Sequence, residues 1–484
     1  MLEDTSWIQI TCSTILCFVF YQVLCVVLPP PNFPKNIPTI PFYVSFLSSY
    51  TSLDQGEIYE QYLKSKLEKH GAVKIYFASR WNILVTRPEY LLEVFKHEDI
   101  YAKSGNQKKI PNSVLALYTG DNIISAHGEV WKTYREILSP NIQFPELKYM
   151  QENTEKFIQI LHNKVATEGS SLSITSLLQN YALQNIGQSV LGVDFGTLEN
   201  QLSHLHKNII YVKLQIFRPF FLNFPTFDSL PIPSRQKAKK EVIKFKKYFA
   251  NLLEDNRDRN SKNATNSLLN ALNTGRINKQ QFMDNAIITM IAGHENPLLL
   301  MLSLFYVLSK HPDLQDRIRD ELQRVDDAGS SPLLLATIYE TLRLFPPLGQ
   351  IINRRTTQPV ILGKDIKIPK GVYVGYNNFG TGRDSSSWGK DASQFVPGRW
   401  GNSIDEINHN FLQAKREATL PAFHGRKRAC LGEKFALIEV KCLIAETVLN
   451  FRILKDPEWK ERLTPAGPVC PMMLKVNFEP LNSI

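Results

Sequence analysis

The strongest constraint on the fold is a nearly unbroken apolar stretch, "MDNAIITMIAGHENPLLLMLSLFYVLSKHP", over residues 283–312. As one helix it would be about 45 Å long. A helix that is apolar on every side has to run through the core of a large domain. The chain has 484 residues, 43% of them hydrophobic, and no internal repeat or second linker divides it. We therefore predict one large domain built around this helix.

A polar island, Gly293-His294-Glu295-Asn296, interrupts this helix at its middle. An unpaired carboxylate in a core is costly, so Glu295 needs a partner or a function. Pro297 has no N–H, and its ring clashes with the carbonyl of Gly293, so we expect a kink that frees this carbonyl for water or a ligand. A proline-kinked helix with one satisfied acid explains the same residues without any site. Both interpretations stay open at this point.

A second uncharged segment lies near the N-terminus, from Trp7 to Leu28. As a helix its 22 residues would span about 33 Å, which is close to the hydrocarbon thickness of a bilayer. A signal peptide would begin with basic residues, whereas this segment follows Glu3 and Asp4. We predict a single N-terminal membrane anchor over residues 1–28.

A proline-rich spacer follows the anchor. Residues 29–41, "PPPNFPKNIPTIP", contain six prolines and are expected to be stiff and extended. Lys35 is the first cation after the span, which biases the rest of the chain to the cytoplasmic side. The sequence therefore predicts a hinge over 29–41 and a cytosolic domain over 42–484.

Within that domain the patterns are mostly helical as far as about residue 347. Residues 71–86 are typical of a strand pair with a turn near Ser79, and residues 360–376 of short strands with turns at Gly363 and Gly371. We expect a mainly α fold with small β-sheets.

The stretch 423–432, "FHGRKRACLG", places Cys430 behind Arg426, Lys427 and Arg428. Neighbouring cations, and the N-terminus of a helix predicted to follow, would stabilise a thiolate and lower the cysteine pKa. Such a thiolate would be either a nucleophile or a metal ligand. The other cysteines form no zinc-binding spacing and no disulfide framework, so we expect a reducing compartment; they stand at positions 12, 17, 25, 442 and 470.

Two further pairs have helical spacing. Glu340 and Arg343 in "YETLRLFPP" lie on an apolar helix, so we expect them to be buried, with Arg399 in "FVPGRW" as a third member. Trp131 and Arg135 in "WKTYR" share one helical face and could bind an anionic cofactor edge. Taken singly, each pair also fits a surface ion pair or a core tryptophan beside a solvated arginine.

Taken in order, these features resemble the cytochrome P450 family over the whole chain, and the cysteine loop with Glu-x-x-Arg carries the resemblance. It implies the P450 fold and haem b, with Cys430 as the axial ligand that pushes electron density onto the iron. The residues it assigns to the haem are Cys430, Arg428, Trp131, Arg135, Arg354 (or Arg355), Phe423 and Gly432. The residues it assigns to a buried network behind the haem are Glu340, Arg343 and Arg399.

The chain departs from the family pattern at two positions. Arg426 stands where the family usually has glycine, and Gly425 comes one place earlier. The family's polar island usually ends in an acid followed by threonine, whereas here Asn296 follows Glu295. Asparagine donates hydrogen bonds but has no acidic proton to relay. We therefore expect Asn296 to hold oxygen and Glu295, with water, to carry protons.

Four segments are similar to a fungal branch of the family that joins two N-formyltyrosine molecules into bisformyl dityrosine during sporulation. They are "SGNQKKIP" (104–111), "AGHENP" (292–297), "VYVGYNNFG" (372–380) and "LTPAGPVCP" (463–471). This similarity implies phenol coupling for the spore or cell wall. The substrate carboxylate would need a cation, for which Lys103, Lys108 and Lys109 are candidates, although a solvated loop explains them as well.

The implied partners are NADPH-cytochrome P450 reductase, a lipid bilayer and a small phenol, with the protein in the endoplasmic reticulum membrane. A formal charge of +10 suits an acidic partner or anionic lipid, or an ordinary basic surface, and no Lys/Arg run is long enough for nucleic acid. The aromatic segment 216–231 could line an entry channel, touch the membrane or pack in the core.

Other functions remain open from the sequence. A monooxygenase that hydroxylates fatty acids, alkanes or sterols would share the fold, and Asn296 gives some weight to a non-catalytic haem-binding sensor or scaffold. A cysteine hydrolase activated by His424 is excluded, because that histidine lies in the same loop and no orienting Asn or Asp is evident.

Overall fold

One helix runs through the middle of the domain, as the apolar stretch predicts. In the computed structural model α15 extends from Lys279 to Lys310 and continues through Pro297. Asn278 begins this helix with a capping box, in which its side chain accepts from the Gln281 N–H. The structure describes residues 2–145, 147–199, 203–325 and 330–481, so positions 1 and 482–484 of the expected anchor and domain lie outside it.

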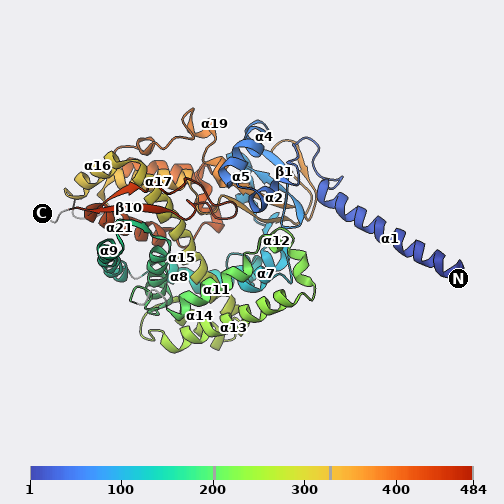
Figure 1. Ribbon diagram of the computed structural model, residues 1–484, viewed down its shortest axis with the longest axis horizontal. Helices are drawn as coiled ribbons and strands as arrows, with labels where there is room; N and C mark the ends of the chain where they lie inside the picture. The colour runs from blue at the N-terminus through green and yellow to red at the C-terminus, as the bar shows by residue number, and fades with distance from the viewer. Residues whose placement is uncertain (1, 146, 200–202, 326–329, 482–484) are drawn as a thin grey trace.

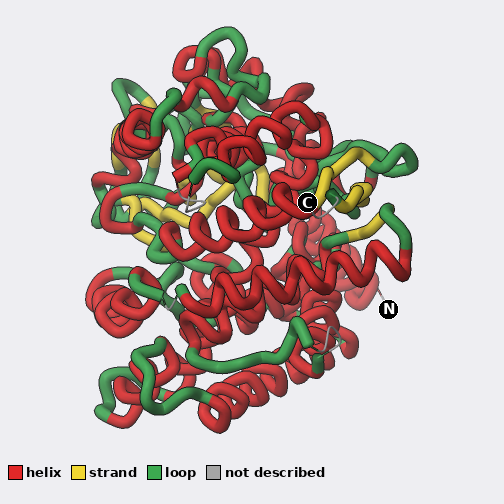
Figure 2. Tube along the Cα trace, turned by 90° about the vertical axis from the view of Figure 1, so that its left-hand side faces the viewer, coloured by secondary structure: helices red, strands yellow, loops and turns green. Residues whose placement is uncertain are grey.

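The fold is mainly helical, which confirms the predicted class (Figures 1 and 2). The helices are α1 (Leu2–Val27), α2 (Val44–Tyr50), α3 (Gln55–Ile58), α4 (Lys64–His70), α5 (Pro88–Lys96), α6 (Asn106–Lys109), α7 (Val114–Thr119), α8 (Gly128–Gln143), α9 (Lys148–Glu168), α10 (Thr175–Ile186), α11 (His204–Ile216), α12 (Pro219–Asn223), α13 (Pro233–Asn256), α14 (Ala264–Asn273), α15, α16 (Pro312–Leu322), α17 (Pro332–Leu344), α18 (Asn378–Thr381), α19 (Ser385–Trp388), α20 (Ile404–Arg416) and α21 (Glu433–Asn450).

Three small sheets complete the fold. The strands are β1 (Ala72–Phe77), β2 (Arg80–Val85), β3 (Tyr101–Lys103), β4 (Ser171–Ser173), β5 (Gln350–Thr356), β6 (Val360–Leu362), β7 (Ile366–Ile368), β8 (Tyr373–Asn377), β9 (Phe451–Lys455) and β10 (Lys475–Pro480). The largest sheet has the order β1-β2-β8-β5-β3. The turn between β1 and β2 lies at Ala78 and Ser79, as predicted, whereas β3 and β5 were not predicted.

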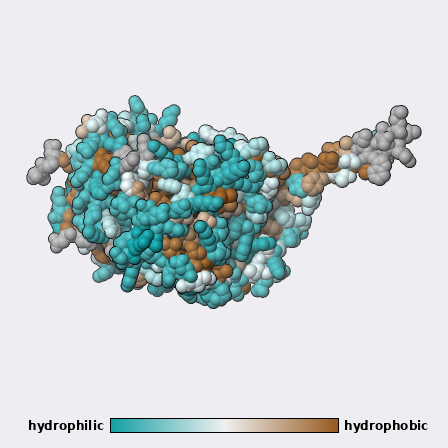
Figure 3. Space-filling model, turned by 90° about the horizontal axis from the view of Figure 1, so that it is seen from below, coloured by the Kyte–Doolittle hydropathy of each residue, from teal (hydrophilic) through white to brown (hydrophobic). Residues whose placement is uncertain are grey.

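The N-terminal helix α1 projects from the domain as a separate rod (Figure 1). The segment Gln9–Val27 is long and apolar enough to cross a membrane, and its most apolar stretch is not buried in the domain. Helix α15 is also long and apolar enough, but 67% of its most apolar stretch is buried in the domain. Burial therefore separates an exposed apolar helix from a core helix of similar composition. Figure 3 shows apolar side chains on α1 beside a mostly hydrophilic domain face.

Candidate active site

A large cavity lies between α15 and the loop that carries Cys430. Helix α15 contributes Thr289, Gly293 and Asn296 to one wall, and residues 422–424 and 428–432 form another. Aliphatic and aromatic side chains supply most of the remaining lining. The Cys430 side chain is exposed to this cavity although its sulfur lies deep inside the protein.

Main-chain geometry holds Cys430 in this position. The Cys430 N–H donates to the Phe423 carbonyl at 2.9 Å, and both residues line the cavity. His424 and Arg426 adopt left-handed φ values of 61° and 56°. Gly425 is required by packing, since a Cβ there would lie 2.6 Å from the Phe95 ring. Arg426 thus takes a left-handed turn at the position where the resemblance expects glycine.

The prediction that Arg426 and Lys427 lower the Cys430 pKa is wrong. Both side chains are exposed at the surface. Arg428 pairs with another group, since its Nη2 lies 2.5 Å from the Glu98 carboxylate. None of the three cations therefore has the role that their spacing in the sequence suggests, which is to stabilise a Cys430 thiolate.

Burial raises the pKa of Cys430 to about 11. Hydrogen bonds from the main chain of Gly432 and Glu433, where α21 begins, act in the opposite direction and favour the thiolate, as the helix N-terminus predicts. Lys415 also favours the thiolate, but burial outweighs these groups, and a metal bound directly to sulfur would shift the balance back to the thiolate.

Three cations, Lys103, Arg135 and Arg428, line the cavity, and Arg354 and Glu98 lie next to them. Arg428 donates from Nε to Glu98 Oε1 at 2.7 Å, and Arg354 binds the other carboxylate oxygen. Four cations are thus gathered near one carboxylate in a charged cluster, and two of them pair with it. Several of their donors have no hydrogen-bond partner in the described chain, namely Nη1 of Arg428 and both Nε and Nη2 of Arg354.

These residues fit the haem that the resemblance implies. Buried donors without partners are costly, and guanidinium groups pair best with carboxylates, which the two haem propionates would supply. A Cβ at Gly432 would lie 4.0 Å from Cys430 Sγ and 3.9 Å from Ile142, so glycine keeps the space beside the sulfur open.

The other predicted haem contacts converge on the same cavity. Trp131 and Arg135 both line it from α8, and the Arg428 guanidinium lies 4.0 Å from the Trp131 ring centroid. Arg354, rather than Arg355, belongs to the charged cluster. Arg355 is exposed and donates to the Gly371 carbonyl at 3.1 Å.

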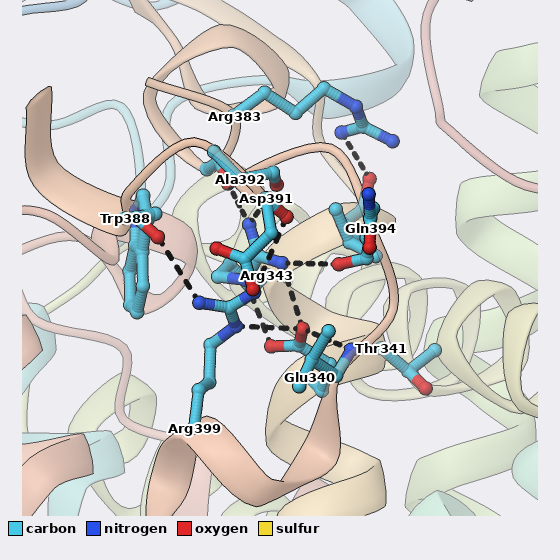
Figure 4. Close-up of polar contacts among 12 residues, drawn as sticks. Glu340, Thr341, Arg343, Arg383, Trp388, Asp391, Ala392, Gln394 and Arg399 are labelled. Carbon is cyan, nitrogen blue, oxygen red and sulfur yellow. Dashed lines mark hydrogen bonds and ion pairs between the residues drawn. The ribbon is translucent and has the colours of Figure 1, made fainter. Parts of the chain in front are cut away.

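The buried network behind the loop is centred on Glu340 (Figure 4). Its carboxylate is fully buried and accepts from Arg343 at 2.8 and 2.9 Å and from Arg399 Nε at 2.9 Å. The Val396 N–H and the Trp400 indole N–H, at 2.8 and 3.1 Å, complete its partners. Glu340 therefore joins α17 to the segment that precedes the cysteine loop.

Arg343 extends this network. It donates to the main-chain carbonyls of Gly382, Ala392 and Gln394. Like Glu340, it is fully buried. The pair is thus not the surface ion pair that its i,i+3 spacing alone would allow.

The polar island divides into residues that line the cavity and residues that do not. The Asn296 side chain lines it and has no hydrogen-bond partner among the described residues. Glu295 instead forms an ion pair of 2.7 Å with Lys213 of α11. His294 is fully buried, and burial lowers its pKa to about 4. A Cβ at Gly293 would lie 2.2 Å from Ile186, so this glycine serves the packing of α15 against α10.

Glu439, in the second turn of α21, is fully buried and has no ion pair with a cation in the described chain. Its Oε1 accepts from Asn185 at 2.8 Å, and burial raises the pKa of this carboxyl well above its usual value. The folded protein therefore holds Glu439 protonated, while the unfolded chain ionises it. Stability should fall by about 1.4 kcal/mol per pH unit as pH rises above about 4.5 towards the folded pKa.

We accordingly expect Glu439→Gln to raise the melting temperature at pH 8 and to leave it nearly unchanged at pH 5. Thermal unfolding of both proteins between pH 5 and pH 8 checks this. Glu446→Gln, at a partly buried acid whose pKa burial also raises, should show a smaller effect of the same sign. A wild-type curve parallel to that of Glu439→Gln at every pH would contradict the assignment.

The three candidate lysines have different surroundings. Lys108 is exposed. Lys109 is buried, but its Nζ donates to the Ile352 carbonyl at 3.0 Å. Lys103 alone of the three lines the cavity, and its side chain is 4% exposed.

Sequence reasoning missed Glu98 and Asn353. Glu98 is a single acid in an ordinary charged turn, and no local pattern links it to Arg354 and Arg428. Asn353 lines the cavity because β5 is irregular there, and the strand itself was not predicted.

The family profile described as Cytochrome P450 matches residues 34–477. The chain is 46% identical to Cytochrome P450-DIT2 of Saccharomyces cerevisiae over 480 residues, covering 97% of this chain and 98% of the relative. It is 37% identical to Cytochrome P450 monooxygenase xanG of Aspergillus fumigatus, covering 89% and 85%. It is 25% identical to human Cytochrome P450 4F3, covering 94% and 91%.

Proposed function

Because the chain belongs to the cytochrome P450 family, an oxidoreductase family whose members hold haem, we propose that it is a membrane-bound haem-thiolate oxidase using O2 and NADPH-derived electrons. One observation carries this proposal: a cysteine faces a cavity beside two guanidinium groups, those of Arg354 and Arg428, which share the single carboxylate of Glu98 and keep buried donors without a partner in the described chain. The haem, when bound, supplies the centre at which O2 is reductively activated.

In this proposal Cys430 would hold the haem iron through Sγ. Arg428, Arg354, Arg135 and Trp131 would donate hydrogen bonds to the propionates, and Phe423 would pack beside the sulfur. Glu340, with its two arginines, keeps the loop at a constant distance from the cavity. The mostly apolar lining would exclude water from the reacting substrate.

Electrons would come from NADPH-cytochrome P450 reductase. Arg426 and Lys427 are exposed on the outer side of the Cys430 loop, where an acidic flavoprotein would dock. Helix α1 would anchor the protein in the endoplasmic reticulum membrane through residues 1–28, with the hinge 29–41 and the domain 42–484 on the cytosolic side.

The proposed reaction couples two N-formyltyrosine molecules into bisformyl dityrosine for a spore or cell wall. Each phenol loses one hydrogen atom, and one carbon–carbon bond forms between the rings. O2 takes up these two hydrogens together with two electrons and two protons from NADPH and H⁺, giving two waters. The similarity of the chain, through four segments and most of its length, to the fungal branch with this activity supports the proposal.

Asn296 would hold oxygen in the cavity, and Glu295 would admit protons from the side of Lys213. We expect Asn296→Ala to lower product formed per O2 consumed by about tenfold, because a hydrogen bond of about 1.4 kcal/mol is lost. Hydrogen peroxide should rise correspondingly. Oxygen, NADPH and peroxide measured together check this, with Asn296→Thr as the matched control that retains a donor. Unchanged coupling in Asn296→Ala would remove the residue from this role.

The direct test is expression of the full chain with reductase in membranes, supplied with N-formyltyrosine and NADPH. Dityrosine fluorescence that depends on both NADPH and O2 is the expected result. A second candidate is hydroxylation of fatty acids, alkanes or sterols, which the mostly apolar lining and the similarity to a protein named a monooxygenase favour. Hydroxylated laurate or sterol without dityrosine would establish it instead.

A further inference from the structure

We infer that Lys103 and Asn353 form the subsite that recognises the carboxylate and the adjoining amide N–H of an N-acyl amino acid. This inference deepens the proposed function and rests on it only for the identity of the phenol. It assigns Lys103 to the carboxylate and Asn353 Oδ1 to the N–H.

The two residues lie on neighbouring strands and line the same cavity. Lys103 ends β3, opposite Arg354 of β5. The next main-chain N–H, that of Ser104, donates to the Asn353 carbonyl at 2.9 Å. This bond holds the ends of the two strands together and fixes the spacing of the two side chains.

A strand irregularity presents Asn353 to the cavity. The pairing of β5 with β8 shifts between Ile352 and Arg354, so Asn353 has no partner on β8. A bulge of this kind redirects one side chain relative to its strand. The Asn353 Oδ1 is buried and has no hydrogen-bond partner in the part of the chain that is described. A buried acceptor without a donor is costly, and a ligand N–H would satisfy it.

Lys103 is a buried amine without an anionic partner in the described chain. Within the described ranges its Nζ has no hydrogen bond and no ion pair, while its side chain is 4% exposed. Burial, Arg354 and Arg428 lower the pKa of Lys103 well below its usual value, and Glu98 raises it. A carboxylate brought in by a ligand would stabilise the charged form.

The charge balance of the cluster leaves room for one ligand carboxylate. Arg354 and Arg428 pair with Glu98, and Lys103 and Arg135 lie near these arginines, so four cations accompany one carboxylate. Two haem propionates would match two of the remaining three charges. The unpaired donors of Arg354 and Arg428 assign the propionates to the arginines, so the unmatched cation is Lys103.

Carboxylate and amide N–H are substituents of the same carbon in an N-acyl amino acid. A lysine and an asparagine side by side can therefore bind both, with the amino acid side chain directed along the apolar lining of Ile351 and Leu348. A fatty acid could supply only the carboxylate and a sterol only a hydroxyl, and an alkane has neither group, so none of them would satisfy both side chains.

Three ligands separate the two contacts. N-formyltyrosine has both groups, N-formyltyramine lacks the carboxylate, and 3-(4-hydroxyphenyl)propionate lacks the formamide. Dissociation constants are measured by equilibrium dialysis on the full-length holoenzyme in nanodiscs. We expect the wild-type protein to bind each truncated ligand about 10- to 100-fold more weakly than N-formyltyrosine.

The variants should remove one preference each. Lys103→Met should bind N-formyltyrosine no better than N-formyltyramine, while its preference for the formamide remains. Asn353→Ala should bind N-formyltyrosine no better than 3-(4-hydroxyphenyl)propionate, while its preference for the carboxylate remains. Lys108→Gln, at the exposed lysine five residues on, is the matched control and should bind as wild type does.

Two outcomes would overturn the inference. One is a Lys103→Met protein whose preference for the carboxylate is unchanged. The other is a lower haem content per chain in Lys103→Met, which would make Lys103 a propionate partner. In that case the wild-type protein should bind N-formyltyrosine and N-formyltyramine equally well. If the binding pattern holds but no dityrosine forms, the proposed function fails and this inference stands.

Discussion

Cys430→Ser is expected to abolish product formation, with a loss of about a thousandfold or more, because a hydroxyl is far harder to ionise than a thiol and is not a soft donor. The loop itself should survive, since the hydrogen bond between residues 430 and 423 is made by the main chain. The buried surroundings of Cys430 also show what a bound metal would change. Burial holds the pKa of the free thiol at about 11, so only direct coordination would keep the sulfur ionised at neutral pH.

The measurement is the absorption spectrum of the reduced carbonyl complex. Wild-type protein should show the far-shifted Soret band of sulfur ligation, and Cys430→Ser should lack it. Cys442→Ser, on α21, is the matched control and should retain both the band and the activity. If the shifted band persisted without the Cys430 sulfur, the assignment of the axial ligand would be wrong.

Glu340→Gln should have the second largest effect, on folding rather than on chemistry. The substitution removes the negative charge from between two arginines while both remain in place. Breaking a buried ion pair on one side costs about 3–5 kcal/mol, against about 5–15 kcal/mol for the whole stability of a typical domain. We expect a large fall in melting temperature and little haem retained in the purified protein.

Asp391→Asn is the control for this prediction. Asp391 contacts Arg399 in the same network at 3.1 Å, but its side chain is 45% exposed, so its loss should cost less than about 1 kcal/mol. A double variant, Glu340→Met with Arg343→Leu, should be less destabilised than the two single variants added together, because neither charge is left buried alone. Equal melting temperatures for Glu340→Gln and Asp391→Asn would show that Glu340 does not stabilise the fold.

The Glu-x-x-Arg and Trp-x-x-x-Arg motifs show which features could be predicted from the sequence. Glu340 and Arg343 lie on an apolar helix that ends at two prolines, so burial and the need for further partners followed from local pattern. The same holds for α15 and for Trp131 with Arg135, since helical periodicity places such residues on one face. These features depend on neighbours within about four residues.

Cys430 shows where prediction from the sequence failed. Sequence proximity placed three cations beside the sulfur, but Arg426 and Lys427 turn outward and Arg428 binds Glu98, a residue more than three hundred positions earlier. Side-chain direction in a loop is set by left-handed backbone and by packing against Phe95, and neither has a local signature.

The amino-acid sequence by itself determined the apolar segments and the helical class, because both follow from composition and short-range periodicity, whereas Cys430 as a metal ligand followed from the family resemblance. Only the tertiary structure decided that Arg354 rather than Arg355 pairs with Glu98, and which of three lysines lines the cavity. It also brought Asn353 into the cavity wall through a strand shift. The reason is physical: burial and unmatched charge are sums over groups that are distant in the chain, and folding alone brings those groups together.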